Sequence, residues 1–177
     1  PPTFFALTTA IALVMARRAS TDWLVVEAGI GGRVDATNVF GRADVVTAVT
    51  AIGLDHTDVL GPTVTAIATE KTAVFAGRTT AVLGPQPSSE AVDVARATAA
   101  EHGVRLVEVA ATNDWRHDAE ATATAVLAEL DTSAPDPVFG SQPGRSEQVN
   151  LPVVRPSRWL FGGAQNPVKL AARGGPR

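Results

Sequence analysis

Residues 23–32 read Trp-Leu-Val-Val-Glu-Ala-Gly-Ile-Gly-Gly. The continuous apolar run at 23–26 predicts a strand buried on both faces, as in a parallel sheet covered by helices. Glu27 ends this run, and the glycines after it predict a tight turn. The stretch therefore predicts one strand-and-turn unit of an α/β fold, with a carboxylate at the carboxyl end of the strand.

Strand and helix patterns alternate beyond this stretch. Apolar residues recur every three or four positions in the predicted helices, whereas the predicted strands are short apolar runs. This alternation predicts the α/β class: a Rossmann-like, mostly parallel sheet flanked by helices. The predicted strands are 23–26, 44–50, 79–83 and 104–109, and the predicted helices are 4–15, 63–74, one from Ser88 or Ser89 to just before Gly103, and 119–130.

The pattern changes from about residue 110. Prolines and glycines recur between 135 and 156, which argues against regular structure there. We predict a central α/β domain over 1–134, shortened after residue 110, and a Pro/Gly-rich linker over 135–158. Residues 159–177 are predicted to be a poorly ordered remnant of a further domain.

The composition excludes several classes of function. With 15 basic against 18 acidic residues and a net charge of −3, the chain shows no basic stripe for nucleic-acid phosphates. The absence of Cys excludes disulfides and thiolate metal sites, and it fits the cytoplasmic location that we expect. The apolar run at 4–15 is too short to span a bilayer, so no membrane partner is expected.

Polar side chains follow two of the predicted strands. Glu27 ends the strand at 23–26, and Asp55 with His56 follows the strand at 44–50. Ligands of open α/β sheets lie beyond the carboxyl ends of the strands, and we expect these two ends to be neighbours. A carboxylate and an imidazole with free positions predict a Mg²⁺ or Mn²⁺ site that takes further ligands from a nucleotide phosphate.

Other interpretations of these residues stay open. Val34 stands where the third glycine of a dinucleotide fingerprint belongs, and no G-x-x-x-x-G-K-[ST] phosphate loop occurs in the 177 residues. Taken singly, Glu27 also fits a surface carboxylate, His56 a structural histidine and Lys71 a solvated lysine. On residue types alone, a metal-dependent hydrolase would use Glu27, Asp35, Asp55, His56 and Asp58.

Three motifs in order along the chain resemble one known family. Residues 27–38 closely resemble the E-x-G-x-G-G-R-x-D-A-T-N signature of folylpolyglutamate and dihydrofolate synthases, which belong to the Mur ligase superfamily. Residues 52–57 look like the I-G-x-D-H-x block of that family, and residues 63–73 are similar to its I-A-x-E-K-A helix. The resemblance implies the fold of a Mur ligase central domain.

The resemblance also implies roles for residues that match the motifs. In this family the residues at the positions of Glu27 and His56 bind the magnesium ion that bridges to ATP. The lysine at the position of Lys71 is carbamylated by CO₂, which turns a cation into an anion that helps to hold metal ions. Lys71 and His56 are thus the expected catalytic residues. Loop-positioning or ligand-orienting roles are implied for Arg33, Asp35, Asn38 and Asp55.

The implied reaction joins an acid to an amine. ATP phosphorylates the carboxylate of a folate or dihydropteroate, and the amine of L-glutamate displaces phosphate to form an amide. The expected cofactor is Mg²⁺, with ATP as a substrate, and the family resemblance points to a monomer.

The resemblance weakens toward the C-terminus. Residues 143–147 look like the family's P-G-R-x-E linker, and residues 161–167 are similar to the D-G-A-H-N-P motif of its C-terminal ligase domain. Gly162 stands there for the aspartate and Gln165 for the histidine, so a nucleotide-binding role for Asn166 is only weakly implied.

We expect the chain to be a central-domain fragment that is inactive alone. Full members of the family carry a phosphate loop in an N-terminal lobe, before the region that this chain matches. Two alternatives remain: a non-catalytic remnant or interaction module of the same fold, and another Mur-type ligase that acts on cell-wall precursors.

Overall fold

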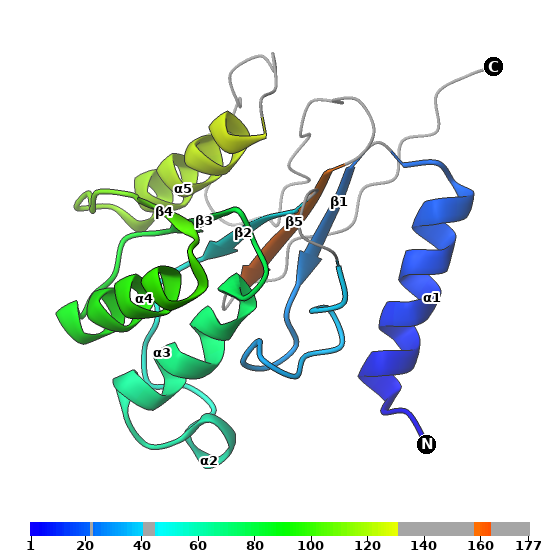
Figure 1. Ribbon diagram of the computed structural model, residues 1–177, viewed down its shortest axis with the longest axis horizontal. Coiled ribbons are helices and arrows are strands. Elements are labelled where there is room, and N and C mark those ends of the chain that lie inside the picture. Colours follow the sequence, from blue (N-terminus) through cyan, green and yellow to red (C-terminus); the bar gives the residue numbers. More distant parts are fainter. Residues whose placement is uncertain (22, 41–44, 131–157, 164–177) are drawn as a thin grey trace.

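The fold is a parallel β-sheet with helices on both faces (Figure 1). A computed structural model describes residues 1–21, 23–40, 45–130 and 158–163. The sheet has five strands in the order β1-β5-β2-β3-β4, and every neighbouring pair is parallel. The predicted α/β class is confirmed. The strands are β1 (Trp23–Glu27), β2 (Val45–Val49), β3 (Thr80–Leu83), β4 (Arg105–Glu108) and β5 (Arg158–Gly163).

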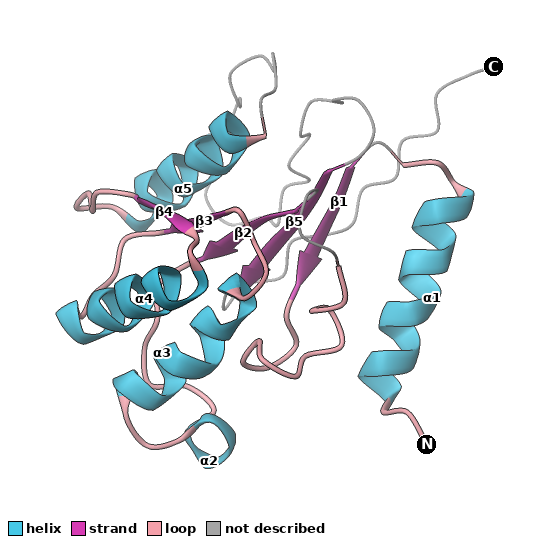
Figure 2. Ribbon diagram, viewed as in Figure 1, coloured by secondary structure: helices cyan, strands magenta, loops and turns pink. Residues whose placement is uncertain are grey.

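Along the chain, helices lie before and between these strands (Figure 2). They are α1 (Phe4–Arg18), α2 (Thr57–Leu60), α3 (Val64–Thr72), the short 3₁₀ helix η1 (Ala73–Phe75), α4 (Ser89–His102) and α5 (Trp115–Glu129). Helices α3 and α4 pack against each other on one face of the sheet, and α5 packs against β2 and β3 on the other face. The sheet is thus buried from both sides, as the apolar strand sequences predicted.

Alternate residues of the strands build two separate cores. Val46 and Ala48 of β2 pack with Val126 of α5, whereas Val49 packs with Ile67 of α3. This division follows from the strand geometry, because successive side chains point to opposite faces of a sheet. β2 carries apolar residues on both faces because each face meets a helix layer.

The ends of α4 lie where the sequence placed them. The Ser88 hydroxyl accepts a hydrogen bond from the Glu90 amide at 3.2 Å, which caps the first turn. Gly103 adopts the left-handed conformation, with φ +63°, just past the last helical residue. A polar N-cap and a C-terminal glycine together predicted this helix correctly.

Helix α5 begins earlier than predicted. It starts at Trp115, because the Asp114 carboxylate accepts a hydrogen bond from the Arg116 amide at 2.8 Å and caps the helix. The predicted helix started at residue 119. The side chains of Trp115, Arg116 and His117 in the first turn are exposed, so apolar periodicity does not reveal this turn.

Helix α1 forms where a helix was predicted, but several of its apolar side chains are exposed. Leu7, Ile11 and Val14 are each 50% exposed, and Phe4 is 83% exposed. Figure 1 shows α1 beside β1, which is the edge strand among the described residues, and within that part of the chain one side of the helix faces the rest of the fold. Thr9 and Ala16 are its buried residues.

Strand β5 corrects one expectation about the sheet. The carboxyl ends of β1 and β2 were expected to be neighbours, but β5 pairs with both strands and lies between them. A parallel pairing between segments so far apart in sequence leaves no local pattern, which is why the sequence did not reveal it. Residues 131–157 and 164–177 lie outside the described residues, so the predicted domain, linker and remnant boundaries stay predictions.

No helix in the described part of the chain is both long enough and apolar enough to cross a membrane.

Gly32 marks the point where the loop after β1 meets the end of α3. A Cβ atom at this position would lie 2.5 Å from Val74 Cγ1 and 3.1 Å from the carbonyl oxygens of Glu70 and Lys71. Backbone oxygens cannot move aside as the end of a side chain can, so the loop approaches α3 this closely only because the residue is glycine.

We therefore expect Gly32→Ala to destabilise the protein by about 1–3 kcal/mol, the usual cost of overpacking a close contact. Gly53→Ala is the matched control, because a Cβ at Gly53 would meet no heavy atom within 4 Å. Urea unfolding followed by circular dichroism measures both free energies of unfolding. Equal midpoints for the two variants would contradict the close contact.

Candidate functional site

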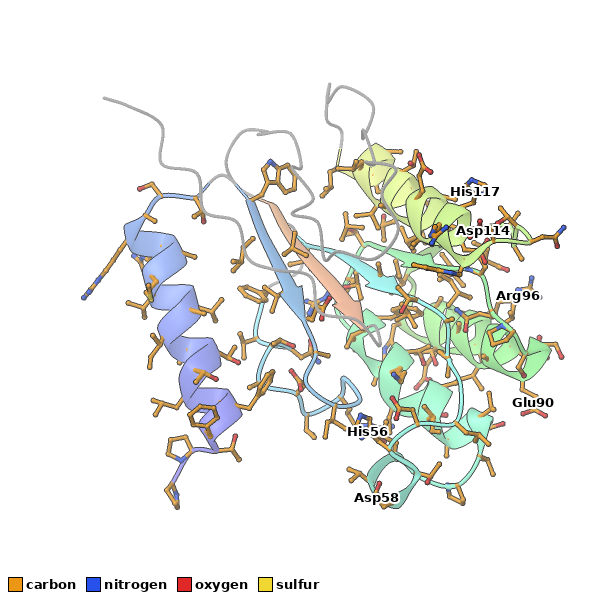
Figure 3. The ribbon with its side chains drawn as sticks, turned by 180° about the vertical axis from the view of Figure 1, so that it is seen from behind. His56, Asp58, Glu90, Arg96, Asp114 and His117 are labelled. Carbon is orange, nitrogen blue, oxygen red and sulfur yellow. The ribbon has the colours of Figure 1, made fainter. Side chains whose placement is uncertain are left out.

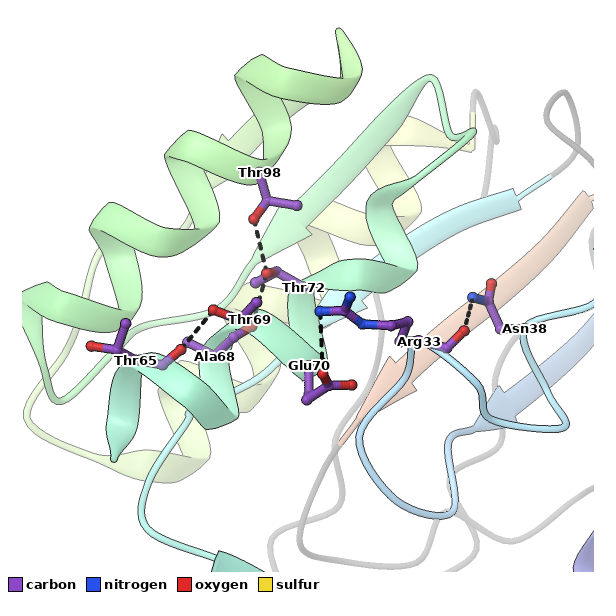
Figure 4. Close-up of polar contacts among 8 residues, drawn as sticks. All are labelled: Arg33, Asn38, Thr65, Ala68, Thr69, Glu70, Thr72 and Thr98. Atoms are coloured by element: carbon purple, nitrogen blue, oxygen red, sulfur yellow. Dashed lines mark hydrogen bonds and ion pairs between the residues drawn. The ribbon is translucent and has the colours of Figure 1, made fainter. Parts of the chain in front are cut away.

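Three sequence-distant segments meet at the carboxyl edge, by which we mean the edge of the sheet where β1, β5 and β2 end. A Cβ at Gly31 would lie 3.0 Å from Leu60 Cδ2, so the loop after β1 also touches α2, the helix that follows His56. The Arg33 guanidinium lies 3.2 Å from the Glu70 carboxylate near the end of α3 (Figure 4). The segments that carry the three sequence motifs are thus brought together by the fold.

The Asp35 carboxylate holds the glycine loop in shape. One oxygen accepts hydrogen bonds from the Gly29 amide at 2.9 Å and the Ile30 amide at 3.2 Å. The other accepts from the Thr37 amide at 2.9 Å and the Thr37 hydroxyl at 2.6 Å. A carboxylate offers about four acceptor positions, and these four donors use them. These contacts are the kind that the predicted loop-positioning role requires, and they leave Asp35 poorly suited to bind a metal ion.

Asn38 closes the same loop and connects it to a buried arginine. Its side-chain amide donates to the Arg33 carbonyl at 3.4 Å, and its carbonyl oxygen accepts from the Arg78 guanidinium at 2.8 Å. Arg78, only 4% exposed, also donates to the Phe40 carbonyl at 2.7 Å. Burial lowers the pKa of Arg78. Sequence reasoning missed Arg78, because a single arginine before a strand carries no local signal of burial.

Glu27 and His56 occupy different parts of the carboxyl edge. Glu27 is the half-buried last residue of β1 and pairs with Gly162 of β5. His56 precedes α2 in the left-handed conformation, φ +50°, and its carbonyl accepts from the Val59 and Leu60 amides at 2.9 and 2.8 Å. With β5 between β1 and β2, the two strand ends are separated by two strand spacings, roughly 10 Å.

The His56 side chain faces outward beside a carboxylate. Its Nε2 lies 3.6 Å from Asp55 Oδ2, and the imidazole side chain is 46% exposed. Figure 3 places His56 and Asp58 together at the end of the molecule where α2 lies. Asp55 was expected to fix the loop or orient ligands, and its position beside the imidazole is compatible with that role.

The donor atoms suit a cation that keeps ligands of its own. Among the described residues, no group of three or more His, Asp or Glu side chains is placed to hold a metal ion. Mg²⁺ keeps several water molecules and commonly takes one or two protein ligands together with phosphate oxygens. A carboxylate at Glu27 and an imidazole at His56 therefore fit Mg²⁺ or Mn²⁺ that is shared with a nucleotide, and do not fit a site enclosed by protein alone.

Lys71 lies in the last turn of α3, half-buried beside the glycine loop. The next residue fixes this end of the helix: the Thr72 hydroxyl hydrogen-bonds the Ala68 carbonyl at 2.8 Å and the Thr98 hydroxyl of α4 at 3.2 Å (Figure 4). Lys71 thus extends from a helix end that is held against α4. Its carbamylation stays a prediction. Asn166 lies outside the described residues, as does Gln165.

Comparisons with known proteins give one consistent result. No family model matches the chain. The chain is 39% identical over 117 residues to the dihydrofolate synthase/folylpolyglutamate synthase of Escherichia coli, which covers 64% of this chain and 27% of that relative. The matched region thus spans about a quarter of the length of this curated relative.

Solved structures lead to the same group of proteins. E. coli FolC in complex with DHPP and ADP superposes with a TM-score of 0.61 at 32% identity, over 75% of this chain and 36% of that one. An FPGS-AMPPCP-folate complex superposes with a TM-score of 0.56 at 36% identity, over 61% of this chain and 26% of that one. Over about 60% of its length, this chain is therefore homologous to the folylpolyglutamate and dihydrofolate synthases.

Proposed function

We propose that this chain is part of an ATP-dependent ligase that adds L-glutamate to the carboxylate of a folate or a dihydropteroate. The observation that carries the proposal is the convergence at the carboxyl edge. The glycine loop, helix α2, which follows His56, and the end of α3 meet there in a chain homologous to these synthases. One of the similar structures is a complex with AMPPCP and folate, and another contains ADP.

Glu27 and His56 are the proposed ligands of Mg²⁺. When bound, the ion would neutralise phosphate charge on ATP, which is its usual contribution to phosphoryl transfer. The carboxylate and imidazole would hold it at the carboxyl edge, where ligands of open α/β sheets bind. Asp35 and Asn38 would keep the glycine loop in the shape that presents Glu27 to this edge.

Lys71 is proposed to react with CO₂. Its neutral amine would form a nitrogen–carbon bond to CO₂ and release a proton, which leaves a carbamate anion near the glycine loop. Only the neutral amine is nucleophilic, so surroundings that disfavour the ammonium ion favour this step.

In the proposed reaction the chain positions groups and contributes charge, without forming a covalent intermediate with the substrate. The γ-phosphoryl group of ATP passes to the substrate carboxylate, and ADP leaves. The amine of glutamate then attacks the acyl phosphate, an amide bond forms, and phosphate leaves. Alignment of the reacting groups supplies much of the rate in such steps.

A second candidate is a folded α/β module without turnover. The 177 residues contain no G-x-x-x-x-G-K-[ST] phosphate loop, and Gly162 and Gln165 replace the acid and the imidazole of the family motif. Isothermal calorimetry with millimolar Mg-ATP, on the chain complemented by a segment that supplies a phosphate loop, separates the two candidates. Binding heat that disappears in Glu27→Gln supports the ligase site, and heat that Glu27→Gln leaves unchanged, or no heat at all, supports the module.

Removal of the proposed metal ligands gives a direct test of the site. We expect Glu27→Gln and His56→Ala each to weaken Mn²⁺ binding by at least about ten-fold, because each removes one protein donor. Electron paramagnetic resonance of free Mn²⁺ measures the affinity. Glu90→Gln is the control, since Figure 3 shows Glu90, at the start of α4, well apart from His56. Unchanged affinity in Glu27→Gln would overturn the metal assignment.

Activity is tested with the chain complemented by a segment that supplies a phosphate loop. We expect ADP release only when Mg²⁺, a folate or dihydropteroate, and glutamate are all present, because the acyl phosphate forms on the acceptor carboxylate. Coupled detection of ADP across a panel of acceptors measures this. Turnover with nucleotide-linked sugars in place of folates would instead assign the chain to the ligases of cell-wall precursors.

A further inference from the structure

Gln86 uses its whole side-chain amide to join two segments at the carboxyl ends of β2 and β3. Its Oε1 accepts a hydrogen bond from the Ile52 amide at 2.9 Å. Its Nε2 donates to the carbonyl oxygens of Thr50 at 2.9 Å and Gly84 at 2.7 Å. The partners fix the orientation of the amide, because a reversed side chain would set oxygen against two carbonyls and NH₂ against an N–H.

The backbone around Gln86 is restrained independently of the Gln86 side chain. Pro85 and Pro87 flank it, so the φ angles of both prolines are fixed, and Gln86, which precedes Pro87, favours extended conformations. The Gly84 amide donates to the Val49 carbonyl at 2.8 Å, so the start of this segment is joined to the end of β2. The side chain of Gln86 therefore extends from a restrained backbone segment.

The segment that Gln86 holds leads directly to His56. Ile52 is 1% exposed and belongs to the core, whereas Leu54 is 64% exposed and adds little packing. Beyond Leu54 the chain is next held where the His56 carbonyl accepts from the amides of α2. Hydrogen bonds at Thr50 and Ile52 therefore set where the exposed part of this loop begins.

We infer that Gln86 is a positioning residue, which sets the place of the Asp55–His56 loop at the carboxyl edge through its three hydrogen bonds to Thr50, Ile52 and Gly84. A role for the positioned His56 in metal binding rests on the proposed function. The positioning of the loop by Gln86 does not depend on that function. Neither of the two substitutions used below meets the three partners: leucine forms no hydrogen bond, and an ionised glutamate donates none.

Histidine resonances of the full chain test this inference without any ligand. The protein has three histidines, so His102 and His117 serve as internal references; Figure 3 shows His117 on α5, well away from His56. In Gln86→Leu we expect the His56 imidazole signal to shift while the other two stay in place. We also expect the Ile52 amide to exchange roughly ten-fold faster, the effect of losing one hydrogen bond.

A general loss of stability would not give this pattern. Asp114→Ala, which removes the N-cap of α5, is the control and should leave the His56 signal in place. If Gln86→Leu speeds exchange at Ile52 but leaves the His56 signal where it is, the inference is overturned. If Gln86→Leu does not fold, Gln86→Glu gives the deciding measurement, because it keeps the size of the side chain.

Gln86→Glu adds a test that depends on chemistry at this position. The ionised carboxylate would face two carbonyl oxygens, whereas the protonated acid again donates one hydrogen bond. The chemical shift of the His56 imidazole is compared between this variant and the unmodified protein at each pH. The difference between the two shifts should become smaller as the pH falls and the acid is protonated. A difference that does not change with pH would count against the inference.

Addition of Mn²⁺ tests the proposed function separately. Paramagnetic broadening of the His56 signal in the unmodified protein supports a metal at His56, and the absence of broadening removes that role. Neither result changes the metal-free comparison of Gln86 variants, so the two proposals fail or stand independently.

Discussion

The close approach of Gly32 to the end of α3 is the contact on which the candidate site depends. Because Gly32 lacks a Cβ, the loop after β1 reaches the carbonyl oxygens of Glu70 and Lys71. This approach seats Arg33 beside Glu70 and brings the loop next to Lys71. A larger residue would separate the glycine loop from α3, and two of the three motif segments would no longer share one edge.

The polar residues of the site divide into those that shape loops and those that remain available to a ligand. Asp35 gives its acceptor positions to backbone amides and one hydroxyl of its own loop, and Arg78 is buried against Asn38 and Phe40. His56 remains largely exposed. This division argues against a metal-dependent hydrolase that counts Asp35 among its ligands, since a carboxylate with four donors has little capacity left.

The sheet itself explains why distant residues gather at one edge. All strands are parallel, so the loops that follow them leave from the same side. The insertion of β5 widens the distance between the ends of β1 and β2. Glu27 and His56, the proposed metal ligands, therefore come from segments that follow strands on the two sides of β5.

The sequence by itself determined the α/β class, the bounds of α4 and the motif residues, because strand burial, helix caps and glycine turns depend on neighbours in the chain. It did not reveal Arg78 or Gln86 as partners of the loops, nor β5 between β1 and β2. Those features join residues far apart in sequence, for which a single sequence carries no spacing or pattern. Only the tertiary structure decided them, because hydrogen bonds between distant segments depend on how the layers pack.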